Sequence, residues 1–277
     1  MDKELDLRCK DYFKAPLFGN RIIFFKKYRE GIYTISNPFE RILRKIIKKN
    51  DEIIIVAPYL PSIYNLASFY GKVNVFYDIK DIVVTSHDKC IIVTNPNIIT
   101  GRVYNKDELD FLVDIIRKNN IYLIIDEEES GFIKNFYNIN QYQMIKPLLY
   151  VINRVYYKKN ISLSLIQGPG LKQGDILNKS YKKLIKFNSS RRKLKKFRKR
   201  REKNYQLLKD YCEKRNIIYM KNIKTSMLTI NITPQLISKR NITFINGCET
   251  GIGNKYITIS LDVNHKKIKE FVKRIEY

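Results

Sequence analysis

Between residues 53 and 152 the sequence alternates short apolar runs with segments of helical periodicity, and this alternation constrains the fold most strongly. The apolar runs cover residues 53–57, 73–76, 90–94, 121–125 and 148–152. Continuous β-branched runs of this kind are typical of strands buried on both faces. Helical patterns precede or separate them at residues 37–47, 61–70 and 107–118. Strand, helix and strand in this order predict right-handed crossovers and a parallel sheet with helices on both faces.

The character of the sequence changes after about Gly174. A long basic helix is predicted from Ser190 to Arg215, and a closing helix from His265 to Ile275. Between them lie two short alternating segments, Met227–Ile232 and Tyr256–Leu261. Strands with helices on one side are typical of a small α+β domain. We therefore predict an N-terminal segment (1–30), a large α/β domain (31–186) and a small C-terminal α+β domain (187–277).

Positive charge is concentrated at the start of the long helix. Lys179–Lys203 contains fourteen basic residues and one acidic residue, a net charge of +13, which is half of the chain's +26. We expect four neighbouring cations on the solvent side: Arg198, Lys199, Arg200 and Arg201. The apolar side consists of Leu184, Phe187, Leu194, Phe197, Tyr205 and Leu208. Such a surface could bind nucleic acid or another polyanion. A solvated helix face, or lysine excess from codon usage, explains the same residues.

Other features exclude several classes of protein. The four cysteines, Cys9, Cys90, Cys212 and Cys248, are scattered and form no CxxC pair. With only two histidines in the chain, this argues against a zinc site and a disulfide framework, so we expect no bound metal. No apolar run approaches the ~20 residues of a membrane span. The charged start, MDKELDLRCK, argues against a secretory signal, and we expect a cytoplasmic protein.

Three polar features follow predicted strands: the loop Asn95–Gly101, Asp126, and the segment Asn153–Lys159. In parallel sheets, ligands bind beyond the carboxyl ends of the strands. An acid at one strand end and a lysine after the next strand could hold a pyridine cofactor. The carboxylate would keep the ring nitrogen protonated, and the lysine would form a Schiff base with the aldehyde.

Residues 95–132, NPNIITGRVYNKDELDFLVDIIRKNNIYLIIDEEESGF, resemble the central segment of class I/II aminotransferases, which are fold type I pyridoxal-phosphate enzymes. In that family the segment reads Asn-Pro-x-Asn-Pro-Thr-Gly, a helix, an apolar strand and Asp-Glu-x-Tyr. The similarity extends to residues 49–70, 189–216 and 253–261. Phe18-Gly19-Asn20 is faintly similar to the threonine-phosphate decarboxylase branch. The resemblance implies a fold type I architecture, bound pyridoxal phosphate, a homodimer, and transamination or decarboxylation of an amino-acid-type substrate.

The resemblance also implies a set of site residues. Asp126 would pair with the pyridine nitrogen, and Lys158 would be the Schiff-base lysine. Ser36 and Asn37, at a helix N-terminus, would lie under the cofactor phosphate. Asn97 and Tyr59 are predicted as further cofactor contacts. The same residues have simpler interpretations: Asp126 as a cap, Lys158 as a solvated lysine, and Asn97 as a turn former.

The sequence departs from the family pattern at several of its functional positions. The replacements are Ile98 for an asparagine, Glu129 for a tyrosine, Val155 and Tyr157 for two serines, Leu60 for a stacking aromatic, and Thr258 for the arginine that binds the substrate carboxylate. The arginine expected after the lysine is missing from ISLSLIQG. Each lost charge-assisted hydrogen bond would cost roughly 1.5–3 kcal/mol. The alternative hypothesis is therefore a homologue that kept the fold, lost the cofactor site and binds a polyanion through Lys179–Lys203.

Overall fold

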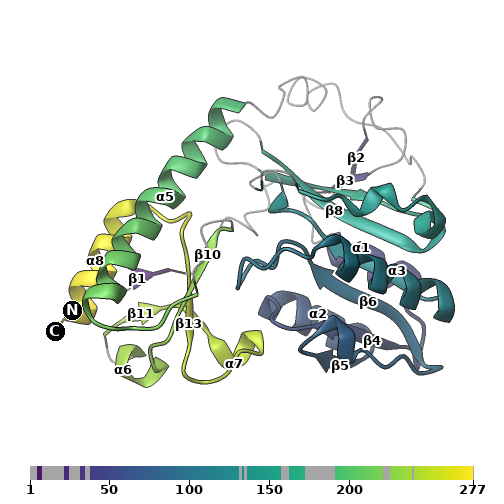
Figure 1. Cartoon of the computed structure of the whole chain (residues 1–277), viewed down its shortest axis with the longest axis horizontal. Helices are drawn as coiled ribbons and strands as arrows, with labels where there is room; N and C mark the ends of the chain where they lie inside the picture. Colours follow the sequence, from purple (N-terminus) through teal and green to yellow (C-terminus); the bar gives the residue numbers. More distant parts are fainter. Residues whose placement is uncertain are drawn as a thin grey trace.

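A computed structural model describes residues 5–7, 22–24, 32–34, 38–130, 133, 136–156, 162–171, 191–220, 225–238 and 240–276. The described residues form two domains (Figure 1). The large domain holds an extended sheet flanked by helices, and the small domain gathers the C-terminal elements against the long helix α5. The fold is thus α/β with a small second domain, as the sequence predicts.

The large domain is built on an eight-stranded sheet in the order β2-β3-β9-β8-β7-β6-β4-β5. Its strands are β2 (Ile22–Phe24), β3 (Ile32–Thr34), β4 (Glu52–Val56), β5 (Lys72–Phe76), β6 (Asp88–Thr94), β7 (Tyr122–Asp126), β8 (Leu149–Tyr156) and β9 (Ser162–Gln167). Strands β5, β4, β6, β7 and β8 pair in parallel. Strand β9 is antiparallel to both β8 and β3, so β3 runs in the same direction as the parallel group. The mostly parallel sheet is confirmed, and the antiparallel β9 is an addition that we did not predict.

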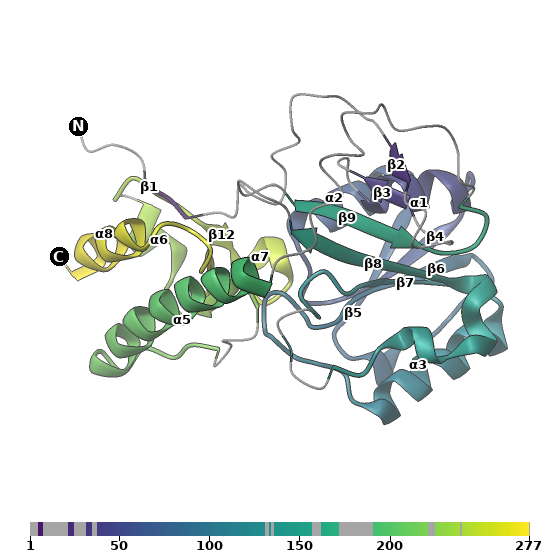
Figure 2. The same ribbon diagram turned by 90° about the horizontal axis from the view of Figure 1, so that it is seen from above.

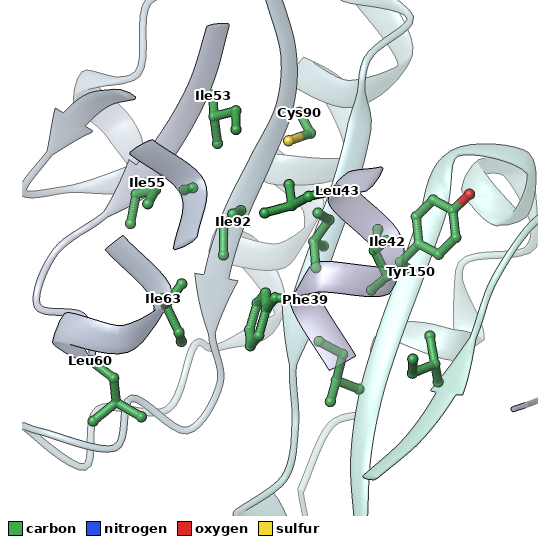
Figure 3. Packing of buried hydrophobic residues seen from close by; sticks show 14 of the residues in the cluster. Phe39, Ile42, Leu43, Ile53, Ile55, Leu60, Ile63, Cys90, Ile92 and Tyr150 are labelled. Atoms are coloured by element: carbon green, nitrogen blue, oxygen red, sulfur yellow. The ribbon is translucent and has the colours of Figure 1, made fainter. Parts of the chain in front are cut away.

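Helices cover both faces of this sheet (Figure 2). Helices α1 (Pro38–Ile46) and α2 (Pro61–Tyr70) pack on one face, and α3 (Lys106–Asn119) on the other, with the 3-10 segments η2 (Ile79–Asp81), η4 (Ile139–Gln141) and η5 (Gln143–Leu148). Figure 3 shows Phe39, Ile42 and Leu43 of α1 in one cluster with the sheet residues Ile55, Ile92 and Tyr150. Burial of this apolar helix face stabilises the layer at roughly 25 cal/mol per Å² removed from water.

The small domain contains a three-stranded antiparallel sheet, β10-β13-β12, and a two-stranded parallel pair, β1-β11. Its elements are β1 (Leu5–Asp6), α5 (Arg191–Lys214), β10 (Met227–Ile230), α6 (Pro234–Ser238), β11 (Ile242–Thr243), β12 (Ile245–Asn246), α7 (Gly247–Thr250), β13 (Ile257–Ser260) and α8 (His265–Glu276). Helices α5 and α8 share one core with the strands, centred on Leu208, Ile259 and Phe271.

Most predicted helices and strands are present within one to two residues of their predicted ends. The described residues of the predicted N-terminal segment are divided between the domains, because β1 pairs with β11 and β2 extends the large sheet. Phe18-Gly19-Asn20 lies outside the described residues. In the described part of the chain, no helix is both long and apolar enough to cross a membrane.

Candidate active site

The carboxyl ends of β3, β4, β6 and β7 meet at one edge of the large sheet, because these strands run in the same direction. Strand β3 ends at Thr34, and α1 begins four residues later at Pro38, so the N-terminus of α1 lies at this edge too. We call it the carboxyl edge. It combines loops after parallel strands with a helix N-terminus, the arrangement in which α/β proteins bind phosphorylated ligands.

Asp126 is the last residue of β7 and stands at the middle of the carboxyl edge. It lies in register with Thr94 of β6 on one side and Ile152 of β8 on the other. Its Oδ1 accepts a hydrogen bond of 2.9 Å from the amide of Glu128, and the residue is partly exposed. A carboxylate that is oriented by a backbone amide and is partly exposed can pair with a protonated ring nitrogen. The cofactor role of Asp126 stays a prediction.

The loop after β6 is held by the Asn97 side chain. Its Nδ2 donates to the Pro58 carbonyl (2.6 Å) and to Thr94 Oγ1 (3.1 Å), and its Oδ1 accepts from the amides of Ile99 and Thr100 at 3.1 Å each. Both donors and both acceptor lone pairs of the amide are thereby used within the protein. The turn-former interpretation of Asn97 accounts for these contacts, and they leave the amide no capacity for a cofactor contact.

Tyr59 follows β4 and is held between two domains. Its ring stacks on Tyr64 with centroids 5.1 Å apart, and its amide donates to the Thr250 carbonyl of the small domain at 3.1 Å. Burial raises the pKa of the Tyr59 hydroxyl. Gly251, at a positive φ of 80°, lies so close that an added Cβ would be 3.4 Å from the Tyr59 ring and 3.3 Å from Ala57 Cβ. Tyr59 is therefore fixed beside the carboxyl edge by contacts with α7.

Two polar side chains are buried just beyond Thr94 and Asp126, on the α3 side of the sheet. Glu127 is fully buried, and its Oε1 accepts from the Ile139 amide at 3.4 Å. Burial raises the pKa of Glu127 to about 8. Glu127 Oε2 and Asn95 Nδ2 are buried without hydrogen-bond partners in the described structure. Glu127 is therefore protonated at neutral pH and adds no negative charge to the carboxyl edge.

Arg41 lies in the first turn of α1. Its Nε is buried and has no hydrogen-bond partner in the described structure, and burial lowers the pKa of its guanidinium. An orphaned guanidinium nitrogen in this turn fits an anion bound at the helix N-terminus. The predicted phosphate contacts Ser36 and Asn37, and the predicted lysine Lys158, lie outside the described residues.

Two departures from the family pattern, Ile98 and Glu129, form contacts between the domains, and a third, Thr258, supports such a contact from within the small domain. The carbonyl of Ile98 accepts from Thr225 Oγ1 at 2.8 Å. Thr258 is fully buried, 2.9 Å from Thr229 Oγ1, which itself donates to the Ile99 carbonyl at 3.2 Å. Glu129 is buried and pairs with Arg201 of α5. These residues therefore hold the small domain on the carboxyl edge.

Arg201 is buried, which contradicts the position predicted for it from the sequence. It was expected on the solvent side of the basic helix, but it is 2% exposed. The prediction was wrong because Arg201 lies seven residues before the buried Leu208 and four after Phe197, within the apolar stripe of the helix. Arg200 donates to the Asp262 carbonyl at 2.9 Å, whereas Arg198 and Lys199 are exposed as predicted. The helix therefore presents fewer cations to solvent than its composition indicates.

A pocket of about 580 Å³ lies elsewhere, lined by η5, the start of β8 and residues 167–171. Its residues include Lys146, Leu149 and Gln167. Because β8 begins there and ends at the carboxyl edge, the pocket is at the opposite end of the strand from Asp126. It is not part of the candidate active site.

The N-terminus of α1 and Asp126 lie at the same carboxyl edge, and residues of the small domain contact the loop after β6 at that edge. The family model described as "Aminotransferase class I and II" matches residues 40–138. An alanine aminotransferase of Mycobacterium tuberculosis is 30% identical over 105 residues, which cover 34% of this chain and 24% of that protein. An aspartate aminotransferase of Bacillus sp. (strain YM-2) is 28% identical over 121 residues, 39% of this chain and 29% of that protein. The matched region thus spans about a quarter of the length of these curated relatives.

Solved structures resemble the chain over nearly its whole length. A Methanococcus jannaschii protein described as similar in its active site to kynurenine aminotransferases superimposes with a TM-score of 0.74 and 17% identity, covering 99% of this chain and 91% of that one. An aspartate aminotransferase double mutant of Thermus thermophilus gives 0.73 and 15%, covering 89% and 75%. At these identities the likeness shows the fold. The predicted fold and the predicted resemblance to class I/II aminotransferases are both confirmed.

Proposed function

We propose that the chain is a pyridoxal-phosphate-dependent aminotransferase of class I/II type, or catalyses the related decarboxylation of an amino acid. The observation that carries the proposal is the position of Asp126. Its carboxylate ends the central strand β7 at the carboxyl edge, in a segment that matches the aminotransferase family model. The N-terminus of α1 and Arg41, whose Nε has no partner in the described structure, would bind the phosphate at the same edge.

Each proposed residue has a defined task. Asp126 would hold a proton on the ring nitrogen through a charge-assisted hydrogen bond. The amides at the start of α1, with Ser36, Asn37 and Arg41, would bind the phosphate. The amine of Lys158 would attach the cofactor covalently. When bound, pyridoxal phosphate supplies an electron sink for a substrate carbanion.

Substrate binding would differ from that of the resembled family. Thr258 stands where that family has the arginine for the substrate carboxylate, and it is buried against Thr229. Losing a charge-assisted hydrogen bond costs roughly 1.5–3 kcal/mol, or about ten- to a hundredfold in affinity. We therefore propose a substrate whose carboxylate is bound weakly or by another residue.

We also propose that the chain forms a homodimer, as the resemblance implies. Light scattering measures its mass in solution, and a monomeric mass would contradict this proposal.

Borohydride reduction in the presence of pyridoxal phosphate tests the proposal. Reduction should fix one pyridoxyl group on the peptide that contains Lys158, and Lys158→Ala should abolish the label. Asp126→Ala should weaken cofactor binding, because the ring nitrogen loses its partner. Lys199→Ala is the matched control, since Lys199 is exposed on α5. Label spread over many surface lysines and unchanged in Lys158→Ala would contradict the proposed function.

A further inference from the structure

We propose that Arg201 is a positioning residue, which fixes the turn Asp126–Ser130 against the small domain and thereby sets the orientation of the Asp126 carboxylate. The residue lies on α5, and the turn lies on the large domain. The inference that Arg201 joins the domains stands on its own contacts. Its consequence for the cofactor rests on the proposed function.

The contacts of Arg201 reach both domains. Its Nη1 lies 2.7 Å from Glu129 Oε2, and its Nη2 lies 3.4 Å from Glu129 Oε1. Its Nε and Nη2 donate to the two carboxylate oxygens of Asp262 at 2.7 and 2.8 Å. All three side chains are at least nine-tenths buried. A planar guanidinium with five donors can bind two carboxylates at once, whereas the single ammonium of a lysine cannot reproduce this geometry.

Glu129 is connected to Asp126 through a short, internally bonded turn. The Glu128 amide donates to Asp126 Oδ1 at 2.9 Å, and the Ser130 amide donates to the Glu127 carbonyl at 2.9 Å. The Glu127 amide is in turn bonded to the Ile152 carbonyl of β8 at 2.7 Å. Only two residues separate Asp126 from Glu129, so a displacement of Glu129 changes the turn that holds Asp126 Oδ1.

The small domain is docked on neighbouring loops by neutral contacts. Thr225 and Thr229 donate to the carbonyls of Ile98 and Ile99, and the Tyr59 amide donates to the Thr250 carbonyl. Met227 packs in the same core as α1 and α2. The small domain is therefore docked by contacts that do not involve the ion pair of Arg201. Its particular effect is on the loop after β7, which the threonine contacts do not touch.

The buried charges indicate which variant tests this role. One cation lies between two carboxylates, so Arg201 variants leave Glu129 and Asp262 buried without it. Glu129→Gln leaves the Arg201–Asp262 pair intact and removes the charge of Glu129 from its contact with Arg201. Glu129→Gln is therefore the informative variant, and Lys199→Gln, exposed on the same helix, is its control.

Native-state hydrogen exchange on the full chain measures the effect without cofactor. In Glu129→Gln the amides of Glu128 and Ser130 should exchange at least about tenfold faster, because the turn opens locally. The amides of Ile124 in β7 and Ile259 in β13 should keep their rates, as all four amides should in Lys199→Gln. Unchanged rates at Glu128 and Ser130, or equal acceleration at all four amides, would overturn the proposal.

A second readout follows the cofactor itself. With pyridoxal phosphate bound to the full chain, the pH midpoint of its visible absorbance should shift by about half a unit or more in Glu129→Gln, and not in Lys199→Gln. An unshifted midpoint would mean that Arg201 joins the domains without acting on Asp126, which overturns the positioning role. Failure to bind the cofactor in the unmodified chain would count against the proposed function instead. In that case the hydrogen-exchange rate of the Glu128 amide, which donates to Asp126, tests the inference.

Discussion

Two loops leave adjacent strands at the carboxyl edge, and they obtain their shapes in different ways. The loop after β6 is organised by Asn97, whose partners lie in the loop, in Thr94 at the end of β6 and in Pro58. The loop after β7 carries three glutamates whose partners are distant: Glu127 accepts from the Ile139 amide, Glu128 from Ser164, and Glu129 from Arg201. The first loop is held mainly by one side chain of its own and by neutral groups. The second is assembled by tertiary contacts of acidic groups.

This difference predicts which of the two loops tolerates substitutions better. A loop whose conformation is fixed by hydrogen bonds from one of its own side chains depends little on distant parts of the protein. A loop of buried carboxylates depends on each distant partner, because an unpaired buried charge is costly. Changes in the loop after β7 should therefore have larger effects and stronger pH dependence than changes in the loop after β6.

The largest effect is expected from removing the cation. Arg201→Met leaves Glu129 and Asp262 buried without their partner, and we expect a loss of about 3–5 kcal/mol in the free energy of unfolding. Lys199→Met, exposed on the same helix, should change it by less than about 0.5 kcal/mol. Urea unfolding followed by circular dichroism measures both. A loss below about 1 kcal/mol for Arg201→Met would mean that the loop after β7 does not depend on this ion pair.

The next effect is a pH dependence that belongs to Glu127. Its pKa is raised from 4.5 to about 8, so the folded protein keeps a proton that the unfolded chain releases. The stabilisation from the neutral Glu127 is fully present below pH 4.5 and is lost as the pH rises through 8, on the order of 5 kcal/mol in all. Unfolding free energies measured from pH 5 to 9 should decline less in Glu127→Gln, which stays neutral. Parallel curves for the two proteins would show that Glu127 ionises normally.

A smaller loss in the free energy of unfolding is expected from a substitution in the loop after β6. Asn97→Ala removes the acceptor for the amides of Ile99 and Thr100 and should cost about 2 kcal/mol. Because these groups are neutral, the loss should be the same at pH 5 and pH 9, in contrast to the Glu127 contribution. Thermal unfolding at the two pH values provides the measurement. A loss that changed with pH would contradict the distinction between the loops.

The smallest effect concerns the contact of the small domain with Tyr59. Gly251→Ala places a Cβ at a positive φ of 80° and within 3.4 Å of Ala57 and the Tyr59 ring. We expect the backbone conformation to lower the free energy of unfolding by about 1 kcal/mol and the close contacts with Ala57 and Tyr59 to add to this loss, with little change in either loop. Gly253→Ala is the control, because it also has a positive φ but no atom within 4 Å of an added Cβ. Equal losses in the two variants would show that the Tyr59 contact adds nothing.

The sequence predicts the large domain well because its signals are local. Apolar runs defined β4, β6 and β7, and Pro61 and Gly71 marked the two ends of α2. Asn97 was recognisable as a turn former because its partners Thr94, Ile99 and Thr100 are near in sequence, whereas its contact with Pro58 spans 39 residues. The role of Arg201 could not be derived in this way, since Glu129 is 72 residues away and Asp262 is 61 away. Its place in the apolar stripe with Phe197 and Leu208 was the one signal available.

A double-mutant cycle between Glu129 and Arg201 tests most directly whether the loop after β7 is held across the two domains. The free energies of unfolding of Glu129→Gln, Arg201→Gln and the double variant, measured against the unmodified chain, give the coupling energy of the pair. We predict about 2 kcal/mol or more, and a coupling near zero in the matching cycle between Glu129 and Lys199. A coupling below about 0.5 kcal/mol between Glu129 and Arg201 would contradict the account.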